Sequence, residues 1–341
     1  MTGAPIIEVR DIRRSFRSVK KEEGLKGALG LLLKPNYVEH QALKGITFSI
    51  EPGSFNGLIG ENGAGKTTLL KILSGLIPPS SGYVRVLGTE PFKRPMDFRR
   101  QIALVMGQKA QLWWDLPALD AFDLLRAIYG IPLKIYQERL HTLSELLDVK
   151  RHLNTQIRRL SLGERMKMEL IGALIHWPSV IFLDEPTIGL DVLAAHKLRE
   201  FLRVFNQREK ATIILTSHNM DDIERLCSRV LIIRSGQMIF DGKPQGLIGQ
   251  GERRLRLRLM QNPTPEELSA AVAIPLGSIH CEQSDEESEA RTYYISIHQN
   301  EIVPILQSAM GRYQITDMGI EEQSLERVIQ KLYEEDRAAA P

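Results

Sequence analysis

The chain is 341 residues long, and its 43% hydrophobic and 25% charged residues are ordinary for a globular protein of about two domains. Its formal charge of +2 excludes a strongly basic nucleic-acid-binding chain, and its two cysteines, Cys227 and Cys281, exclude a disulfide framework. No apolar run approaches the ~18–20 residues that cross a bilayer, so the chain is expected in the cytosol unless a partner holds it at a membrane.

The N-terminal part of the chain predicts two strands separated by an insert. Residues 6–12 alternate like an edge strand that ends near Phe16, and Ala42 to Ile50 form the second strand. The insert spans residues 18–40 and predicts a short amphipathic helix with lysines around it. This helix either packs on its own domain, belongs to a disordered insert, or touches a membrane surface or a membrane partner. Its helical spacing comes from four leucines: Leu25, Leu29, Leu32 and Leu33.

A glycine-rich segment follows an apolar strand and precedes a helical segment. Residues 60–67 match the phosphate-binding pattern G-x-x-x-x-G-K-[ST] at every fixed position. The glycines let successive backbone N–H groups point at one spot, and the helix N-terminus adds positive potential there. Lys66 would reach the β- and γ-phosphates of a nucleotide, and the Thr67 hydroxyl would ligate Mg²⁺. The predicted nucleotide-binding residues of this loop are Gly60, Glu61, Asn62, Gly63, Ala64, Gly65, Lys66, Thr67 and Thr68.

Strands alternate with helices through the following part of the chain, which predicts an α/β domain with a mostly parallel core sheet. A turn at Ser80-Ser81-Gly82 precedes the first of these strands. The predicted strands, with the polar residues that end them, are 83–87, 102–106, 180–185, 211–218 and a hairpin of 230–234 with 237–240; the predicted helices are 116–152, broken at Pro132, then 164–176 and 192–207.

Polar residues end three of these strands, at the edge where parallel sheets bind ligands. Asp184 closes an apolar strand, as the second Mg²⁺ contact of a phosphate-loop NTPase requires. Glu185 beside it can orient and polarise the attacking water. His218 can contact the γ-phosphate, and Gln108 can bond the metal or the water. Taken alone, a histidine such as His218 is more often an ordinary residue at a strand end, and a lone glutamine such as Gln108 is weak evidence for a site.

The character of the sequence changes after residues 242–244. Residues 253–259 alternate arginine with leucine, which predicts a strand with one solvated face; no aromatic residues interleave as nucleic-acid stacking would need. The acidic residues 282–289 predict a solvated loop. A small α+β domain without a catalytic pattern is expected here, with a structural or regulatory role. Its other predicted elements are strand 293–298, helix 301–310, strand 313–315 and helix 324–333.

Together these motifs resemble the nucleotide-binding domain of ATP-binding cassette (ABC) proteins, over residues 6–245. The matching segments, in order, are Gly60–Thr67 for the first nucleotide motif, Gln108 for the Q-loop, Leu160–Glu164 for the signature, Ile181–Glu185 for the second nucleotide motif, Gly189–Asp191 for the D-loop and His218 for the switch histidine. The resemblance implies a P-loop NTPase domain at 1–245, with an antiparallel β subdomain and a helical subdomain near 110–176. The small α+β domain then occupies 246–341.

The resemblance also implies ATP and Mg²⁺ as ligands, in a site shared by two copies of the domain paired head-to-tail. Each ATP would lie between one phosphate loop and the partner's Ser161 and Gly163, with the D-loop Asp191 beside it. Glu185, His218 and Gln108 are the implied catalytic residues, and Thr67, Asp184 and Gln108 the implied metal ligands. Leu162 and Glu164 replace the usual glycine and glutamine of the signature. We expect this departure to change the affinity for ATP and the rate of hydrolysis more than the ability to hydrolyse ATP. Either Phe16, which we favour, or Tyr37 stacks on adenine.

Residues 315–326 resemble the small C-terminal domain of bacterial type-two ABC exporter ATPases, and residues 158–165 and the insert resemble the same branch. This implies an exporter ATPase, paired with itself or a close paralogue, held at the cytoplasmic face of the inner (plasma) membrane by a separate permease, with no nucleic acid partner. The alternatives are a soluble ABC ATPase acting on ribosomes or DNA, which usually carries two cassettes, zinc modules or coiled coils, and an importer ATPase, which often carries a longer C-terminal domain. Trp113 and Trp114 either anchor the helical subdomain or dock the permease.

Overall fold

The computed structural model describes residues 4–19, 37–107, 110–247, 252–281, 290–322, 325–326 and 328–329. The chain divides into two compact units, Met1–Lys243 and Pro244–Pro341. The predicted insert helix, Gln108, the acidic loop 282–289 and most of the predicted helix 324–333 lie outside the described residues.

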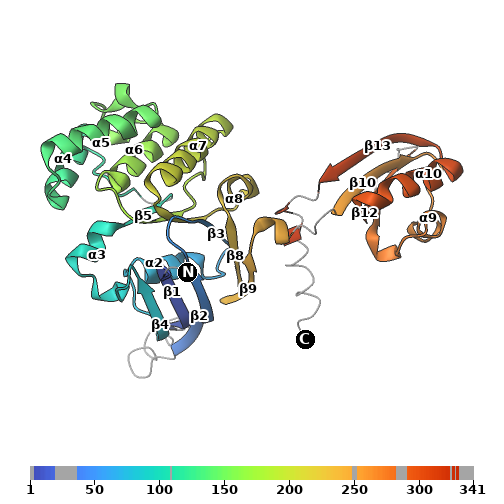
Figure 1. Cartoon of the computed structure of the whole chain (residues 1–341), viewed down its shortest axis with the longest axis horizontal. Coiled ribbons are helices and arrows are strands. Elements are labelled where there is room, and N and C mark those ends of the chain that lie inside the picture. The colour runs from blue at the N-terminus through green and yellow to red at the C-terminus, as the bar shows by residue number, and fades with distance from the viewer. Residues whose placement is uncertain are drawn as a thin grey trace, which may run out of the picture. The chain divides into compact units, whose positions relative to one another are not determined.

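A six-stranded sheet forms the centre of the first unit, in the order β5-β6-β7-β3-β8-β9 (Figure 1). All neighbours are parallel except β8 and β9, which form the predicted terminal hairpin. In β6 the first four residues, Val180 to Leu183, are apolar and buried, because helices cover both faces of a parallel sheet. The predicted α/β fold with a mostly parallel sheet is confirmed. The strands are β3 Phe55–Ile59, β5 Ile102–Met106, β6 Val180–Asp184, β7 Thr212–Thr216, β8 Arg229–Arg234 and β9 Gln237–Gly242.

Helices connect and cover these strands. Leu133 begins a new helix after Gly130 and Pro132, so the predicted break at Pro132 separates two helices. The green helices α4 and α5 stand away from the blue β1–β2–β4 sheet in Figure 1, with the core sheet between them. None of the helices in the described part of the chain combines the length and the apolar character needed to span a bilayer. The helices are α2 Lys66–Leu73, α3 Met96–Gln101, α4 Ala118–Tyr129, α5 Leu133–Leu146, α6 Leu162–Leu174, α7 Val192–Glu209 and α8 Met220–Leu226.

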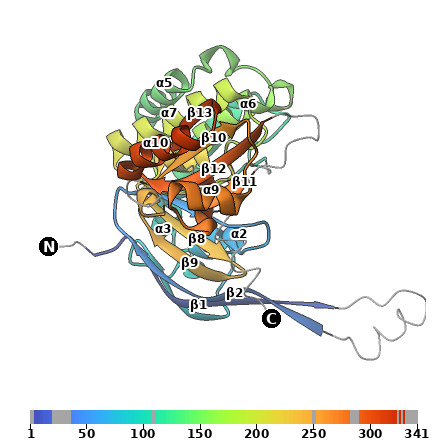
Figure 2. The ribbon, with the colours of Figure 1, turned by 90° about the vertical axis from the view of Figure 1, so that its right-hand side faces the viewer.

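A three-stranded antiparallel sheet, in the order β2-β1-β4, completes the first unit. Its strands are β1 Ile7–Val19, β2 Tyr37–Ile50 and β4 Ser81–Val86. The prediction of an edge strand at residues 6–12 is wrong, because β1 pairs with β2 on one side and β4 on the other. The predicted turn at 80–82 is also partly wrong, since Ser81 and Gly82 already belong to β4. Figure 2 shows β1 and β2 extending together as a long ribbon.

The second unit has the element order β-α-β-β-α-β, with the sheet order β11-β12-β10-β13. Leu255, Leu257 and Leu259 of β10 are buried against the two helices, while the intervening arginines lie on the opposite face. The predicted strand 313–315 begins too early and is too short, and α9 and β11 were not predicted. The elements are β10 Glu252–Leu259, α9 Pro265–Val272, β11 Ile279–Cys281, β12 Arg291–His298, α10 Ile302–Arg312 and β13 Ile315–Glu322.

Candidate functional site

The phosphate loop lies between the end of β3 and the start of α2. Gly65 is the N-cap of α2 with φ +109°, and Gly63 has φ +83°, two left-handed conformations that only glycine adopts at little cost. A Cβ on Gly65 would lie 2.6 Å from the carbonyl oxygen of Ala42, and one on Gly60 would lie 2.3 Å from that of Ile233. A Cβ on Gly63 would meet nothing within 4 Å, so the loop is packed beneath and open at its tip.

Lys66 is buried under this loop and holds its backbone. The Lys66 Nζ donates to the carbonyl oxygens of Gly60, at 2.6 Å, and Glu61, at 3.2 Å. Burial lowers the pKa of Lys66, and the carboxylates of Glu185 and Asp184 oppose that shift. Asn62 lies exposed at the loop tip, Ala64 is buried, and Thr68 is half-buried one residue after Thr67. The loop therefore offers a cation and backbone N–H groups to an anion.

Oxygen atoms from three elements meet at Asp184. The Thr67 hydroxyl donates to Asp184 Oδ2 at 2.8 Å, and the Thr216 hydroxyl donates to Asp184 Oδ1 at 2.7 Å. The register of β6 and β7 explains the second contact, since Asp184 and Thr216 are paired across the sheet. Hydroxyl and carboxylate oxygens are the ligands that Mg²⁺ prefers, so Thr67 and Asp184 fit the predicted metal site.

Glu185 and His218 face each other beside this cluster. The His218 Nε2 lies 3.0 Å from the Glu185 Oε1. Glu185 has φ +55°, a strained conformation for a residue with a side chain, and its N–H donates to the Thr216 hydroxyl at 3.0 Å. A Cβ on Gly107 would lie 2.2 Å from the Glu185 carbonyl oxygen, so the residue that follows β5 lies close to the backbone of Glu185. Gln108, the residue after Gly107, lies outside the described residues.

Thr216 is the member of this cluster that the sequence reasoning missed. It holds both Asp184 and the backbone of Glu185, and it is fully buried. The available signal was its place at the carboxyl end of a buried strand, two residues before His218. Its partner could be recognised only from the pairing of β6 with β7.

Ser161 and the signature residues form a separate, self-contained arrangement at the start of α6. Ser161 and Glu164 make a reciprocal capping box, and Glu164 also accepts a contact from His152 Nε2 at 2.9 Å. The hydrogen bonds from Ser161 lower the pKa of Glu164. Within the described residues, no hydrogen bond joins Ser161 to the phosphate loop. The departure from glutamine to Glu164 is therefore accommodated locally, by the cap and by the positive end of the helix.

The D-loop contacts this helix start. Asp191 is the N-cap of α7 and accepts the Ala194 N–H at 2.8 Å. A Cβ on Gly189 would lie 2.9 Å from Leu162 Cδ2, so the leucine that replaces the usual glycine packs over Gly189. A Cβ on Gly163 would lie 3.4 Å from the Cβ of Ala194.

The two candidate adenine-stacking residues lie on the β1–β2 ribbon. Phe16 is 38% exposed, and the Arg14 guanidinium lies 4.7 Å from its ring centroid. Phe16 pairs with His40, whereas Tyr37 pairs with Val19 farther along the ribbon. The ring of Phe16 is thus an exposed apolar surface with a cation beside it.

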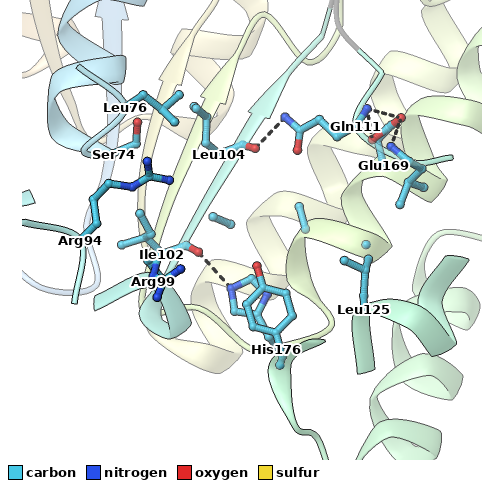
Figure 3. A pocket seen from close by; sticks show the side chains of 15 residues that line it. Ser74, Leu76, Arg94, Arg99, Ile102, Leu104, Gln111, Leu125, Glu169 and His176 are labelled. Atoms are coloured by element: carbon cyan, nitrogen blue, oxygen red, sulfur yellow. Dashed lines mark hydrogen bonds between the residues drawn. The ribbon is translucent and has the colours of Figure 1, made fainter. Parts of the chain in front are cut away.

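A groove of about 290 Å³ lies between β5 and the helices α4 and α6; we call it the β5–α6 groove. Figure 3 shows Gln111 spanning it, with its side chain donating to the Leu104 carbonyl oxygen and its N–H donating to Glu169. Burial raises the pKa of Glu169 and lowers that of His176 to about 4, so His176 is neutral at physiological pH. Arg94 and Arg99 line the opposite side.

Trp113 and Trp114 follow the groove-lining residues Gln111 and Leu112. They are 44% and 47% exposed, while Leu112 is buried. The Arg165 guanidinium lies 4.9 Å from the Trp114 ring centroid. The interpretation of this pair as core anchors is therefore wrong, because neither ring is enclosed by the helices around it.

Comparisons with known proteins agree with this geometry. Residues 43–188 match the family model described as ABC transporter. The chain is 33% identical over 207 residues to the ABC transporter ATP-binding protein NatA of Bacillus subtilis, covering 61% of this chain and 84% of that protein. It is 35% identical to the Nod factor export ATP-binding protein I of Cupriavidus metallidurans, covering 62% of this chain and 69% of that protein.

Solved structures show the same fold. A structure titled as the ATP-binding subunit of an ABC transporter has a TM-score of 0.58 at 26% identity, covering 72% of this chain and 92% of that one. A dimeric ATP-binding cassette bound to ADP and Pi has a TM-score of 0.58 at 21% identity, covering 70% of this chain and 98% of that one. At that identity, the second likeness concerns the fold alone.

Proposed function

Since this chain belongs to the ABC transporter ATP-binding family, we propose that it is the ATP-hydrolysing subunit of a membrane exporter, driving a permease carried on a separate chain. The observation that carries the proposal is the convergence of Lys66, Thr67, Asp184, Glu185 and His218 at one edge of the core sheet. Residues 1–245 form its nucleotide-binding domain and residues 246–341 an accessory domain. The protein lies at the cytoplasmic face of the inner membrane through its permease.

The residues of the site divide the chemistry among them. Lys66 exchanges its backbone carbonyl partners for the β- and γ-phosphates of ATP. Thr67 and Asp184 would hold Mg²⁺, which supplies charge neutralisation at the phosphates when bound. Glu185 accepts a proton from the attacking water, and His218, in contact with Glu185, orients the carboxylate toward that water. Thr216 keeps Asp184 and Glu185 in fixed relation.

The site is completed by a second copy of the chain. Ser161 caps a helix N-terminus, where backbone N–H groups and the helix dipole favour an anion. Its described hydrogen bonds stay within its own segment, which supports a role facing a partner's γ-phosphate. Near it lie exposed apolar side chains, Leu162, Ile188, Val192 and Leu193. ATP would therefore join two copies head-to-tail, and hydrolysis would release them.

Export is the direction we infer, because relatives that cover 62% and 63% of this chain are named for Nod factor export. The test is to isolate the tagged full chain from its native membranes and measure ATP hydrolysis. A co-purifying multi-span membrane protein that raises the ATPase rate, together with ATP-dependent release of cargo from the cytoplasmic side, supports the proposal. Co-purification with ribosomes or DNA, or uptake in the same assay, would contradict it.

Replacing Phe16 with alanine is expected to weaken ATP binding by about 5- to 150-fold, the ~1–3 kcal/mol of one base–aromatic stack. The exposed Phe16 ring and its neighbouring Arg14 suit a stacked base. Fluorescence titration with an adenine nucleotide analogue measures the loss, and Tyr37→Ala serves as the matched comparison. A larger loss in Tyr37→Ala than in Phe16→Ala would transfer the stacking role to Tyr37.

Docking of the permease is proposed at the β5–α6 groove and the adjoining tryptophans. Gln111 and Leu112 line the groove, and Glu169 holds the backbone N–H groups of both. Trp113 and Trp114 thus extend from an anchored segment as exposed aromatic side chains, which are common interface anchors. Arg94 and Arg99 favour a partner segment with an acidic residue beside its apolar ones.

The double substitution Trp113→Ala with Trp114→Ala is expected to weaken binding to the permease by at least about 30-fold, since buried tryptophans at interfaces commonly carry about 2 kcal/mol or more. Basal ATP hydrolysis by the isolated chain should stay within about twofold. Co-purification and permease-stimulated ATPase activity measure the effect. A matched control is Ile128→Ala, an exposed apolar side chain on α4. Unchanged binding and stimulation in the double variant would remove the tryptophans from this role.

A further inference from the structure

Asp222 is a fully buried carboxylate that the mechanism above does not use. It lies in the first turn of α8, four residues after His218, and is 0% exposed. Its Oδ1 accepts the Arg199 Nη1 at 2.8 Å, and Arg199, on α7, is itself 7% exposed. A buried carboxylate is retained at a cost unless its partners satisfy it, so its contacts identify what it holds in place.

The second oxygen of Asp222 joins two loops. Its Oδ2 accepts the Thr187 hydroxyl at 2.6 Å and the Ser217 hydroxyl at 2.6 Å. Thr187 stands two residues after Glu185, and Ser217 stands immediately before His218. One carboxylate oxygen therefore ties together the two segments that bring Glu185 and His218 to 3.0 Å.

The directions of these bonds make the arrangement specific. The Ser217 hydroxyl donates to Asp222 while it accepts the Asn219 N–H at 3.0 Å, so both of its roles are occupied. On the other side, the chain around Glu185 is strained, with φ +55° at Glu185 itself. Strained backbone persists where surrounding contacts over-determine it, and the Thr187 bond is such a contact.

We propose that Asp222 is a positioning residue for ATP hydrolysis, which sets the relation of Glu185 to His218 by holding Thr187 and Ser217. The inference rests on the proposed function, because it assigns a task to a contact between the two residues proposed for the chemistry. It acts through Thr187 and Ser217 and touches neither nucleotide nor water itself.

Thr187→Val tests the positioning role by removing one hydroxyl with little change of shape. We expect kcat for ATP hydrolysis to fall by about 10- to 100-fold, as misplacement of a catalytic group by about 1 Å does. The KM for ATP and the affinity for a fluorescent nucleotide analogue should stay within about twofold, because the phosphate loop is untouched. Thr187→Ser, which restores the donor, should recover most of kcat. Asp222→Asn is a stronger variant, whose loss of charge beside Arg199 also threatens folding.

Thr212→Val is the matched control. Thr212 is also fully buried, lies on β7 at the end opposite Thr216, and accepts the Gly53 N–H at 2.8 Å. The Thr212→Val substitution should lower Tm about as much as Thr187→Val does, while leaving kcat for ATP hydrolysis within about twofold of the wild type. In a His218→Ala background, Thr187→Val should add little further loss, because the two changes disable one arrangement.

The outcomes separate the inference from the proposed function. A wild-type chain without ATPase activity would overturn the proposed function and the positioning role with it. Full turnover in Glu185→Gln would exclude Glu185 as the base, and would therefore overturn the positioning role while the chain remains an ATPase. If the wild type is active, two results would overturn the positioning role alone. One is an equal loss of kcat in Thr187→Val and Thr212→Val. The other is a double variant in which the losses of kcat from Thr187→Val and His218→Ala multiply.

Discussion

Glu185→Gln is expected to lower the rate of ATP hydrolysis by about 10²- to 10⁴-fold, the range of general acid–base catalysis, while ATP binding stays intact. Glutamine keeps the size and the hydrogen-bonding oxygen of Glu185 but cannot accept a proton from water. His218, 3.0 Å from that carboxylate, would then hold an amide in place of a base. In the proposed cycle ATP joins two copies and hydrolysis releases them, so the variant should also accumulate as a closed dimer.

Single-turnover phosphate release measures the chemical step, and size-exclusion chromatography with ATP measures the dimer. The matched control is Glu138→Gln, on the exposed face of α5, which removes a glutamate carboxylate distant in sequence from the proposed catalytic residues. This variant should hydrolyse ATP at the wild-type rate. Wild-type turnover in Glu185→Gln would exclude Glu185 from its assigned role. Loss of turnover without a stable ATP-bound dimer would contradict the composite site instead.

Lys66→Ala is expected to weaken ATP binding by roughly 30- to 5,000-fold, since truncating one partner of a buried charge pair costs about 2–5 kcal/mol. Lys66 is 6% exposed and already aimed beneath the loop, with its ammonium held by the carbonyl oxygens of Gly60 and Glu61. The alanine variant loses both the cation for the phosphates and these two bonds, so some loosening of the loop contributes to the effect.

Lys71→Ala provides the matched control, because Lys71 lies on the same helix near its C-terminal end. Equilibrium binding of a fluorescent ATP analogue, with adenosine as competitor, separates the phosphate contribution from that of the base. We expect Lys66→Ala to lose affinity for ATP and to keep its weak affinity for adenosine. Equal losses in both lysine variants would show that the phosphates are bound elsewhere.

Much of the first unit could be predicted from local pattern. The motif at residues 60–67 predicts phosphate binding without further information, because spaced glycines, a lysine and a threonine must occur together to hold phosphates. Apolar runs that end in Asp184 or His218 indicate buried parallel strands, and such strands place their last residues at one edge. The structure brings Lys66, Thr67, Asp184, Glu185 and His218 to that edge.

The second unit was predicted less completely. The leucine and arginine alternation of β10 identified a strand because burial of one face leaves a period of two in the sequence. Helix α9 has a capping box at Thr264 and Glu267 that was present in the sequence and went unrecognised. Strand β13 is mostly exposed, so its pattern carried little of the burial signal by which strands are recognised.

The phosphate loop, the carboxylates and histidine at strand ends, and the alternation of strands and helices could all be recognised in the sequence, because each depends on residues close together in the chain. The central place of β1 in its sheet, the hydrogen bond of Thr216 to Asp184 and the bonds of Asp222 to the loops of Glu185 and His218 became visible only in the folded chain. Alternation in a sequence shows which side of a strand is buried, whereas hydrogen-bond partners come from segments distant in the chain. The phosphate loop is recognised from one continuous segment, but the residues that position the catalytic side chains lie on strands and helices that only folding brings together.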